Sequence, residues 1–171
     1  MSDPDARLSV MLRRGIGTLK FGASPAQVES YFGEPYSRDD GFSRGPVWSW
    51  RVAQLHPHGD GTLHAGFEPV VDGRLAVVAF KSDSRHVRYR HLALCGANEE
   101  DALRDLRNTG LTFLATLDTS GMDYLAFSDG LTLTSRGKVI IDFSWTVDDA
   151  GMFWIDATAP RVVDWSHPSL Q

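Results

Sequence analysis

The segment from Ile16 to Pro35 constrains the fold more than any other part of the chain, because nearly every residue in it has a structural role. Ser24 is placed to cap a helix, and Gln27 follows three residues later, as in a capping box. Gly33 permits a left-handed residue at the end of that helix, and the proline two positions later prevents its continuation. The pattern therefore predicts a short extended piece followed by a helix that begins at Pro25.

Two further helices are expected. Asn98 can cap a helix that runs to about Asn108, because three acidic residues follow the cap and Gly110 can end the helix. Near the start of the chain, Pro4 fits a first helical position and Gly15 fits a stop, which predicts a helix between them.

Most of the remaining chain has the period of two that is typical of β-strands. Trp48 and Trp50 alternate with smaller or polar residues, and most aromatic side chains are expected in the core. Ile141, Phe143 and Trp145 are expected to face the side opposite to their neighbours Ile140, Asp142 and Ser144. The expected strands cover residues 47–52, 63–67, 75–80, 111–117, 124–127, 131–135, 139–146 and 152–158.

Helices and strands come in separate runs, which indicates an α+β fold. The pattern predicts two successive helix-plus-antiparallel-strand units, at about residues 15–82 and 97–158, forming one mainly antiparallel sheet packed by short helices. The pattern alone also allows the two units to pack as a pair without sharing a sheet. A length of 171 residues fits a single domain over 1–171.

The net charge of −5 is unevenly distributed. Residues 1–91 hold 12 Lys and Arg against 10 Asp and Glu, a net +2, whereas residues 92–171 hold 5 against 12, a net −7. An acidic half disfavours general nucleic-acid binding, which depends on neutralising phosphates. It would suit a basic protein partner, although acidity that merely keeps the protein in solution is the alternative.

Cys95 is the only cysteine, so the chain can form neither an internal disulfide nor a multi-cysteine metal site. The apolar run around it predicts a small buried hydrophobic side chain. The start of the sequence lacks the basic flank and apolar run of a signal peptide, and no stretch approaches the ~20 apolar residues of a membrane span. These features predict a cytoplasmic protein that does not associate with membranes.

The acidic C-terminal half contains the candidate partner-binding residues. Adjacent Phe153 and Trp154 must point to opposite faces of a regular strand, so one of them is expected to be exposed unless both faces of the sheet are covered. Asp142, Asp148 and Asp149 would give this surface its charge. Paired carboxylates can also act as acid and base, but here two of them stand in an evident turn, where aspartate is favoured by the backbone.

The basic run over residues 81–91 is the candidate anion-binding segment. If Val87 and Tyr89 face inward, the side chains between them project together, and Arg85, Arg88 and Arg90 could hold a phosphate or an acidic partner. A solvated edge strand that is protected by its charge is the alternative.

No catalytic or cofactor motif is present in the sequence. It contains no nucleophile elbow, no metalloprotease helix and no phosphate-binding loop, so no cofactor is expected. His56, His58 and His64, with Asp60 among them, form the densest histidine cluster. Their spacing matches no standard metal site and their setting is a turn, so no metal is expected, although metal binding stays an open alternative.

The run from Gly17 to Pro35 resembles the opening of many small bacterial α+β domains, namely an apolar pair, Gly, a small residue, Ser, and a short helix that ends in Phe-Gly-Glu-Pro. It is similar to domains of the outer-membrane assembly lipoprotein and beta-lactamase-inhibitor-protein type, and to immunity proteins of polymorphic toxin systems. Unlike the lipoproteins, this sequence has no lipidation cysteine near its start. The resemblance implies a helix-plus-sheet fold and a binding role, and it transfers no active site.

The sequence therefore predicts a non-enzymatic bacterial immunity or inhibitor-like protein that covers a partner protein's active surface. A domain that binds a small anionic ligand, or an enzyme, using the basic run over residues 81–91 is the alternative. A structural subunit of a homo-oligomer is a third possibility.

Overall fold

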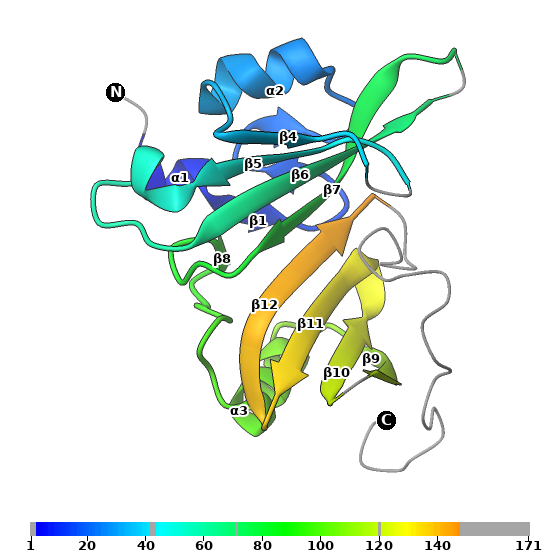
Figure 1. Cartoon of the computed structure of the whole chain (residues 1–171). Helices are drawn as coiled ribbons and strands as arrows, with labels where there is room; N and C mark the ends of the chain where they lie inside the picture. Colours follow the sequence, from blue (N-terminus) through cyan, green and yellow to red (C-terminus); the bar gives the residue numbers. More distant parts are fainter. Residues whose placement is uncertain (1–2, 42–43, 71, 120, 148–171) are drawn as a thin grey trace.

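The computed structural model describes residues 3–41, 44–70, 72–119 and 121–147 (Figure 1). The protein is mixed α and β, with most of its regular structure in antiparallel strands and little in helices. The helices are α1 (Pro4–Arg7), α2 (Pro25–Phe32) and α3 (Glu99–Asn108), with 3-10 turns η1 (Val52–Gln54) and η2 (Ser128–Gly130). The strands are β1 (Ser9–Met11), β2 (Gly15–Ile16), β3 (Leu19–Lys20), β4 (Ser37–Asp39), β5 (Val47–Arg51), β6 (Thr62–Pro69), β7 (Leu75–Ser82), β8 (Arg88–Tyr89), β9 (Phe113–Thr119), β10 (Met122–Phe127), β11 (Leu131–Arg136) and β12 (Val139–Thr146).

The strands within the described ranges form two sheets. The larger has eight strands in the order β4-β5-β6-β7-β12-β11-β10-β9, and every neighbouring pair in it is antiparallel. The smaller has the order β3-β2-β1-β8, in which β1 and β8 run parallel. Within the larger sheet, β7 and β12 are paired in the centre, so strands from the first half of the chain join directly to strands from the second half.

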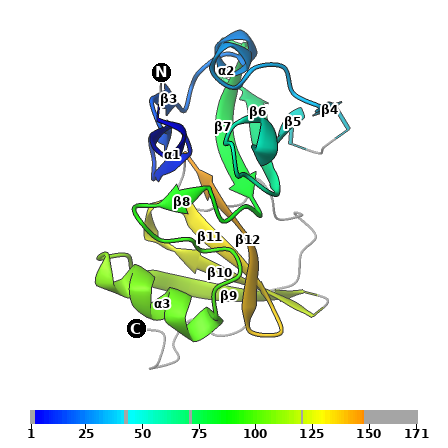
Figure 2. The same cartoon turned by 90° about the vertical axis from the view of Figure 1, so that its left-hand side faces the viewer.

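The main core lies on one face of the eight-stranded sheet, and a small cluster of Val47 and Ala79 is buried on the other. The helices and the small sheet all lie on that side, as the two views show (Figures 1 and 2). Large aromatic side chains of the sheet point into this core, as their alternation predicted. The fully buried ones are Trp50, Phe67, Phe80, Phe127, Phe143 and Trp145.

Helix α2 begins and ends where its sequence signals predicted. The Ser24 hydroxyl accepts a hydrogen bond from the backbone N–H of Gln27 at 3.2 Å, and the Gln27 side chain accepts one from the Ser24 N–H at 2.8 Å. Val28 and Phe32 are buried, and Phe32 packs against the Trp50 ring. The capping box therefore fixes the start of the helix, and these two side chains fix which face meets the sheet.

The predicted N-terminal helix is wrong beyond its first turn. Helix α1 covers four residues, and the chain then extends into β1, where Val10 pairs with Ile16 of β2 and with Tyr89 of β8. Burying Val10 between two strands outweighs the weak helical pattern, because a narrow apolar stripe stabilises a short helix little.

The expected alternation along β12 is wrong at its first residues. A register shift between Thr134 and Ser135 of β11 leaves one residue of β12 unpaired, so Ser135 pairs with Ile140. Beyond this bulge Ile140 is in the core with Phe143, although a strict period of two put them on opposite faces.

The expected strand over residues 152–158 lies outside the described residues. Within the described ranges, no helix is long and apolar enough to cross a membrane.

Candidate functional site

A row of polar side chains crosses the face of the eight-stranded sheet that points away from the aromatic core. Ser49 of β5 pairs with His64 of β6, His64 pairs with Lys81 of β7, and Lys81 pairs with Ser144 of β12. Asp142, two residues before Ser144 on β12, lies on the same face. We call Ser49, His64, Lys81 and Asp142 the polar row. It lies on four adjacent strands, so the sheet itself holds these side chains in register.

The members of the polar row contact one another in two pairs. Ser49 Oγ and His64 Nδ1 share a hydrogen bond of 2.6 Å. Lys81 Nζ lies 3.7 Å from Asp142 Oδ2, which is an ion-pair distance but beyond the ~3.2 Å limit of a good hydrogen bond. The other oxygen of the same carboxylate, Asp142 Oδ1, is buried and has no hydrogen-bond partner in the described part of the chain.

The electrostatic setting of the polar row keeps His64 neutral at pH 7. Burial lowers the pKa of His64 below its ordinary value, and the Lys81 ammonium acts in the same direction. Asp83 and Asp142 oppose this with smaller effects. Farther along the face, burial and then the charge of Asp142 raise the pKa of Tyr124.

The Ser49–His64 pair lies inside the hydrogen-bond ladder of the sheet. A serine bonded to a neutral histidine resembles a nucleophile and its base, but acyl transfer also needs backbone N–H donors for the developing oxyanion. Ser49 is in an interior strand, paired with β4 on one side and β6 on the other, so the ladder already uses the neighbouring backbone groups. The polar row is therefore a rigid set of donors and acceptors on a sheet face.

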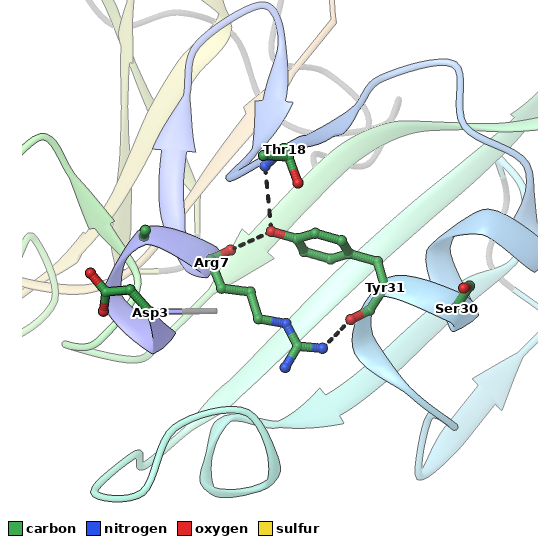
Figure 3. Close-up of a pocket in the computed structure, with 6 residues that line it drawn as sticks. Asp3, Arg7, Thr18, Ser30 and Tyr31 are labelled. Carbon is green, nitrogen blue, oxygen red and sulfur yellow. Dashed lines mark hydrogen bonds between the residues drawn. The ribbon is translucent and has the colours of Figure 1, made fainter. Parts of the chain in front are cut away.

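A hollow of about 390 Å³ lies between α1, α2 and the β2–β3 turn (Figure 3). The Tyr31 hydroxyl donates to the backbone carbonyl of Arg7 at 3.2 Å and accepts from the backbone N–H of Thr18 at 3.4 Å. The Arg7 guanidinium donates to the Tyr31 carbonyl. Figure 3 shows the Asp3 and Ser30 side chains on opposite sides of the Arg7–Tyr31 pair, so the two do not point toward a common position. The contacts between Arg7 and Tyr31 fasten α1 to α2 beside the hollow, and we call them the joint.

The three arginines of the basic run have different local surroundings. Val87 and Tyr89 are buried, as expected if the charged residues between them face outward. Arg88 Nε donates to the carbonyl of Arg85, whereas Arg90 has a left-handed backbone with φ 56° and lies over the Tyr89 ring. Arg90 instead lines a separate hollow of about 490 Å³ beside the end of α3. Neither Arg85 nor Arg88 is among the residues that line this hollow.

The histidine cluster also divides. The His56 ring lies against His86, with 4.6 Å between ring centroids, and its Nε2 is 3.0 Å from Asp5 Oδ1. His86 Nδ1 lies 3.4 Å from Asp60 Oδ1, but the two atoms do not meet the geometry of a hydrogen bond. His64 belongs to the polar row. Across the residues whose positions are described, no three His, Cys, Asp or Glu side chains gather in a way that could hold a metal ion.

Of the predicted partner-binding residues, Asp142 is in the polar row, and Asp148, Asp149, Phe153 and Trp154 lie outside the described residues. Cys95 is buried, as predicted; burial, and then the charges of Asp142 and Asp83, raise the pKa of its thiol. Sequence reasoning missed Ser49 and Lys81 as site residues. The alternation of Ser49 with two tryptophans was the available signal, but strand register was needed to place Lys81 beside it.

No family model, no curated protein and no solved structure matches this chain.

Proposed function

We propose that this chain is a non-enzymatic protein-binding domain of the bacterial immunity or inhibitor type, which acts in the cytoplasm by covering the active surface of a partner protein. The observation that carries the proposal is the polar row. It sets a hydroxyl, a neutral imidazole, an ammonium and a carboxylate on a rigid sheet face, without the backbone donors that acyl-transfer chemistry requires.

The arrangement of the chain supports a two-unit design, which we propose as the finer description of the fold. Helix α2 precedes β4 to β7, helix α3 precedes β9 to β12, and the last strands of the two sets, β7 and β12, pair in the centre. The units would cover about residues 15–82 and 97–158 and form one binding face. The similarity of residues 17–35 to small bacterial binding domains supports the same proposal.

The proposed partner is a basic protein domain, such as a toxin, and neither a nucleic acid nor a membrane. The net charge of −7 over residues 92–171 supports this choice, because opposite fields accelerate encounter and an acidic surface repels phosphates.

The proposal is tested by capture from the source cells, followed by sizing with light scattering. We expect a complex with one stoichiometric protein partner. Thr62 projects from the same face as His64, so Thr62→Arg should weaken the complex at least about tenfold by adding bulk and positive charge. Glu100→Arg on the exposed side of α3 is the matched control and should leave binding unchanged. The absence of a stoichiometric partner, or equal loss in both variants, would count decisively against the proposed function.

A second candidate function is the binding of a small anionic ligand, or an enzymatic activity on one, by the basic run. The hollow lined by Arg90 and His91 favours it, because a guanidinium at a concave surface can hold an anion, whereas the Asp105 carboxylate in the same lining opposes one. Inorganic phosphate at millimolar concentration should then raise the melting temperature. Arg90→Gly is an informative control, since glycine suits the left-handed backbone and the variant should fold while losing the shift. An equal shift in both proteins would rule out this site.

A further inference from the structure

We propose that the basic protein partner adds an extended segment to the outer edge of β9, and that a lysine or arginine of this segment pairs with Asp118. The inference rests on the proposed function, because it names a surface and a chemistry by which such a partner would be held. The surface is an edge of the eight-stranded sheet and is separate from the face that carries the polar row.

Strand β9 is the last strand of the eight-stranded sheet at the end formed by the second half of the chain (Figure 1). Among the described strands it pairs with β10 alone. Alternate residues of an antiparallel strand turn their backbone N–H and C=O groups away from the paired neighbour, so the outer edge of β9 presents a row of donors and acceptors. An extended segment of another protein can bond to such a row and continue the sheet.

The two edges of the sheet differ in their protection against further pairing. Strand β4, at the opposite edge, has three residues, and two of them, Arg38 and Asp39, are exposed charges. Short edge strands and charged side chains discourage a further strand. Strand β9 has seven residues, of which only Asp118 is charged and none is proline. A register shift near its start leaves residues 115–119 as a regular run of about 16 Å, which suits a partner segment of about five residues.

Both ends of this run can be reached from outside. Leu114, just before the run, is 36% exposed, and Asp118, near its other end, is also exposed. A segment that lies along β9 can therefore contact both side chains without opening the core.

The charges around Asp118 favour a basic segment. Asp118 lies directly opposite Asp123 of β10, and like charges at opposite positions destabilise a strand pair. Asp123 in turn lies opposite Ser135 of β11, whose hydroxyl donates to Glu99 at 2.6 Å. Burial, and then the charges of Asp118 and Glu99, raise the pKa of Asp123, while Lys138 opposes them with a smaller effect. A cation placed opposite Asp118 would relieve this repulsion between carboxylates.

Charge also decides between a foreign segment and a second copy of this chain. Strand β9 contains no basic residue, so no register of two paired copies sets a cation opposite Asp118. The net charge of −7 over residues 92–171 would also make two copies repel each other. A foreign strand in which basic and β-branched residues alternate avoids both costs, because its basic side chains share one face with Asp118.

The direct test is a nuclear magnetic resonance titration of the labelled full chain with the peptide acetyl-Lys-Val-Thr-Val-Lys-amide. We expect saturable shifts of the backbone amides of residues 115–119, with a millimolar dissociation constant. The same peptide with glutamate in place of both lysines should bind at least about fivefold more weakly. A peptide with proline in place of threonine keeps both charges but lacks a backbone N–H, and it should also lose at least about fivefold in affinity.

A charge reversal on the chain itself gives a second test. Asp118→Lys should bind the lysine peptide at least about fivefold more weakly, and the glutamate peptide more tightly, than the unaltered chain does. Asp39→Lys is the matched control, because Asp39 is an exposed aspartate on the opposite edge strand, and it should change neither affinity. Asp118 is exposed, so the variant should fold, which the dispersion of its amide signals checks.

Three results would overturn the inference: shifts that do not saturate, equal affinities for the lysine and glutamate peptides, or a dimer of the chain that shields the β9 amides. Its failure can be separated from that of the proposed function. A captured partner whose affinity is unchanged by Asp118→Lys would overturn the edge contact and leave the proposed function standing. Saturable binding of the lysine peptide at β9, without any protein partner in the source cells, would keep the edge site and overturn the protein-binding function.

Discussion

At the scale of single residues, two glycines with positive φ differ in what an added side chain would meet. Gly33, which ends α2, has φ 87°, and a Cβ added there would meet nothing within 4 Å. Gly17 has φ 55°, and an added Cβ would lie 2.2 Å from the Tyr31 hydroxyl and 2.8 Å from the Arg7 carbonyl oxygen. A side chain at the first position costs backbone strain alone, whereas one at the second also forces apart the joint shown in Figure 3.

Gly33→Val should therefore destabilise the protein by about 2–3 kcal/mol, because Gly33 combines φ 87° with ψ −173°, a region almost confined to glycine, and valine is β-branched. Gly17→Ala should cost more despite its smaller side chain, at least about 3 kcal/mol, because a clash with main-chain atoms is added to the strain of its positive φ. Urea unfolding of both variants measures the two losses. If Gly17→Ala is as stable as Gly33→Val, then Tyr31 and Arg7 can move away from the added methyl group at little cost in free energy.

His64 predicts a pH dependence. Because its pKa is lowered in the folded protein, the unfolded chain takes up a proton first as the pH falls below about 6.5. The contribution of His64 to stability is thus complete above that range and is lost as the pH falls toward the folded pKa. His64→Gln should flatten the stability curve just below about pH 6.5, measured by urea unfolding across pH, relative to the unaltered chain. A curve of unchanged slope would mean that His64 already titrates normally in the folded state.

At the scale of elements, local signals could be predicted from the sequence and pairing partners could not. The ends of α2 and α3 follow from Ser24, Gly33 and Asn98, whose effects act within one helical turn. Val10 is in a strand because it pairs with Tyr89, almost eighty residues later in the chain. Nothing in the sequence near β1 indicates this partner. Short strands whose stability comes from distant partners are therefore the elements that a sequence pattern misses.

The cap of α2 is a test at this scale. Ser24→Ala removes the acceptor for the Gln27 N–H and should destabilise the protein by about 1 kcal/mol, seen as a lower melting temperature. Ser24→Asp keeps an acceptor at the same position and should stay within a few tenths of a kcal/mol of the original. If both variants lose the same free energy of unfolding, the hydrogen bond to the Gln27 N–H does not stabilise the protein.

At the scale of the whole molecule, the polar row exists only because four strands are in register. Its members come from β5, β6, β7 and β12, and the pairing of β7 with β12 brings Lys81 beside a carboxylate sixty-one residues later. The sequence identified Asp142 by its charge and His64 by its place in a histidine cluster, but it held no information on which residues would lie opposite them. Strand order is set by the whole core, so a site built across a sheet is beyond prediction from local patterns.

The same central pairing predicts that the molecule unfolds as one unit. Trp145 of β12 is fully buried, stacks on Phe143, and donates a hydrogen bond of 2.8 Å from Nε1 to the carbonyl of Gly15, 130 residues earlier. Trp145→Phe keeps most of the ring but leaves that carbonyl unpaired, which should cost about 1–3 kcal/mol. We expect a single urea transition, coincident by circular dichroism and fluorescence, shifted to lower denaturant in the variant. Trp48→Phe, at a half-buried position near the sheet edge, should shift it less. Two separate transitions in the unaltered chain would show that its halves are stable without each other.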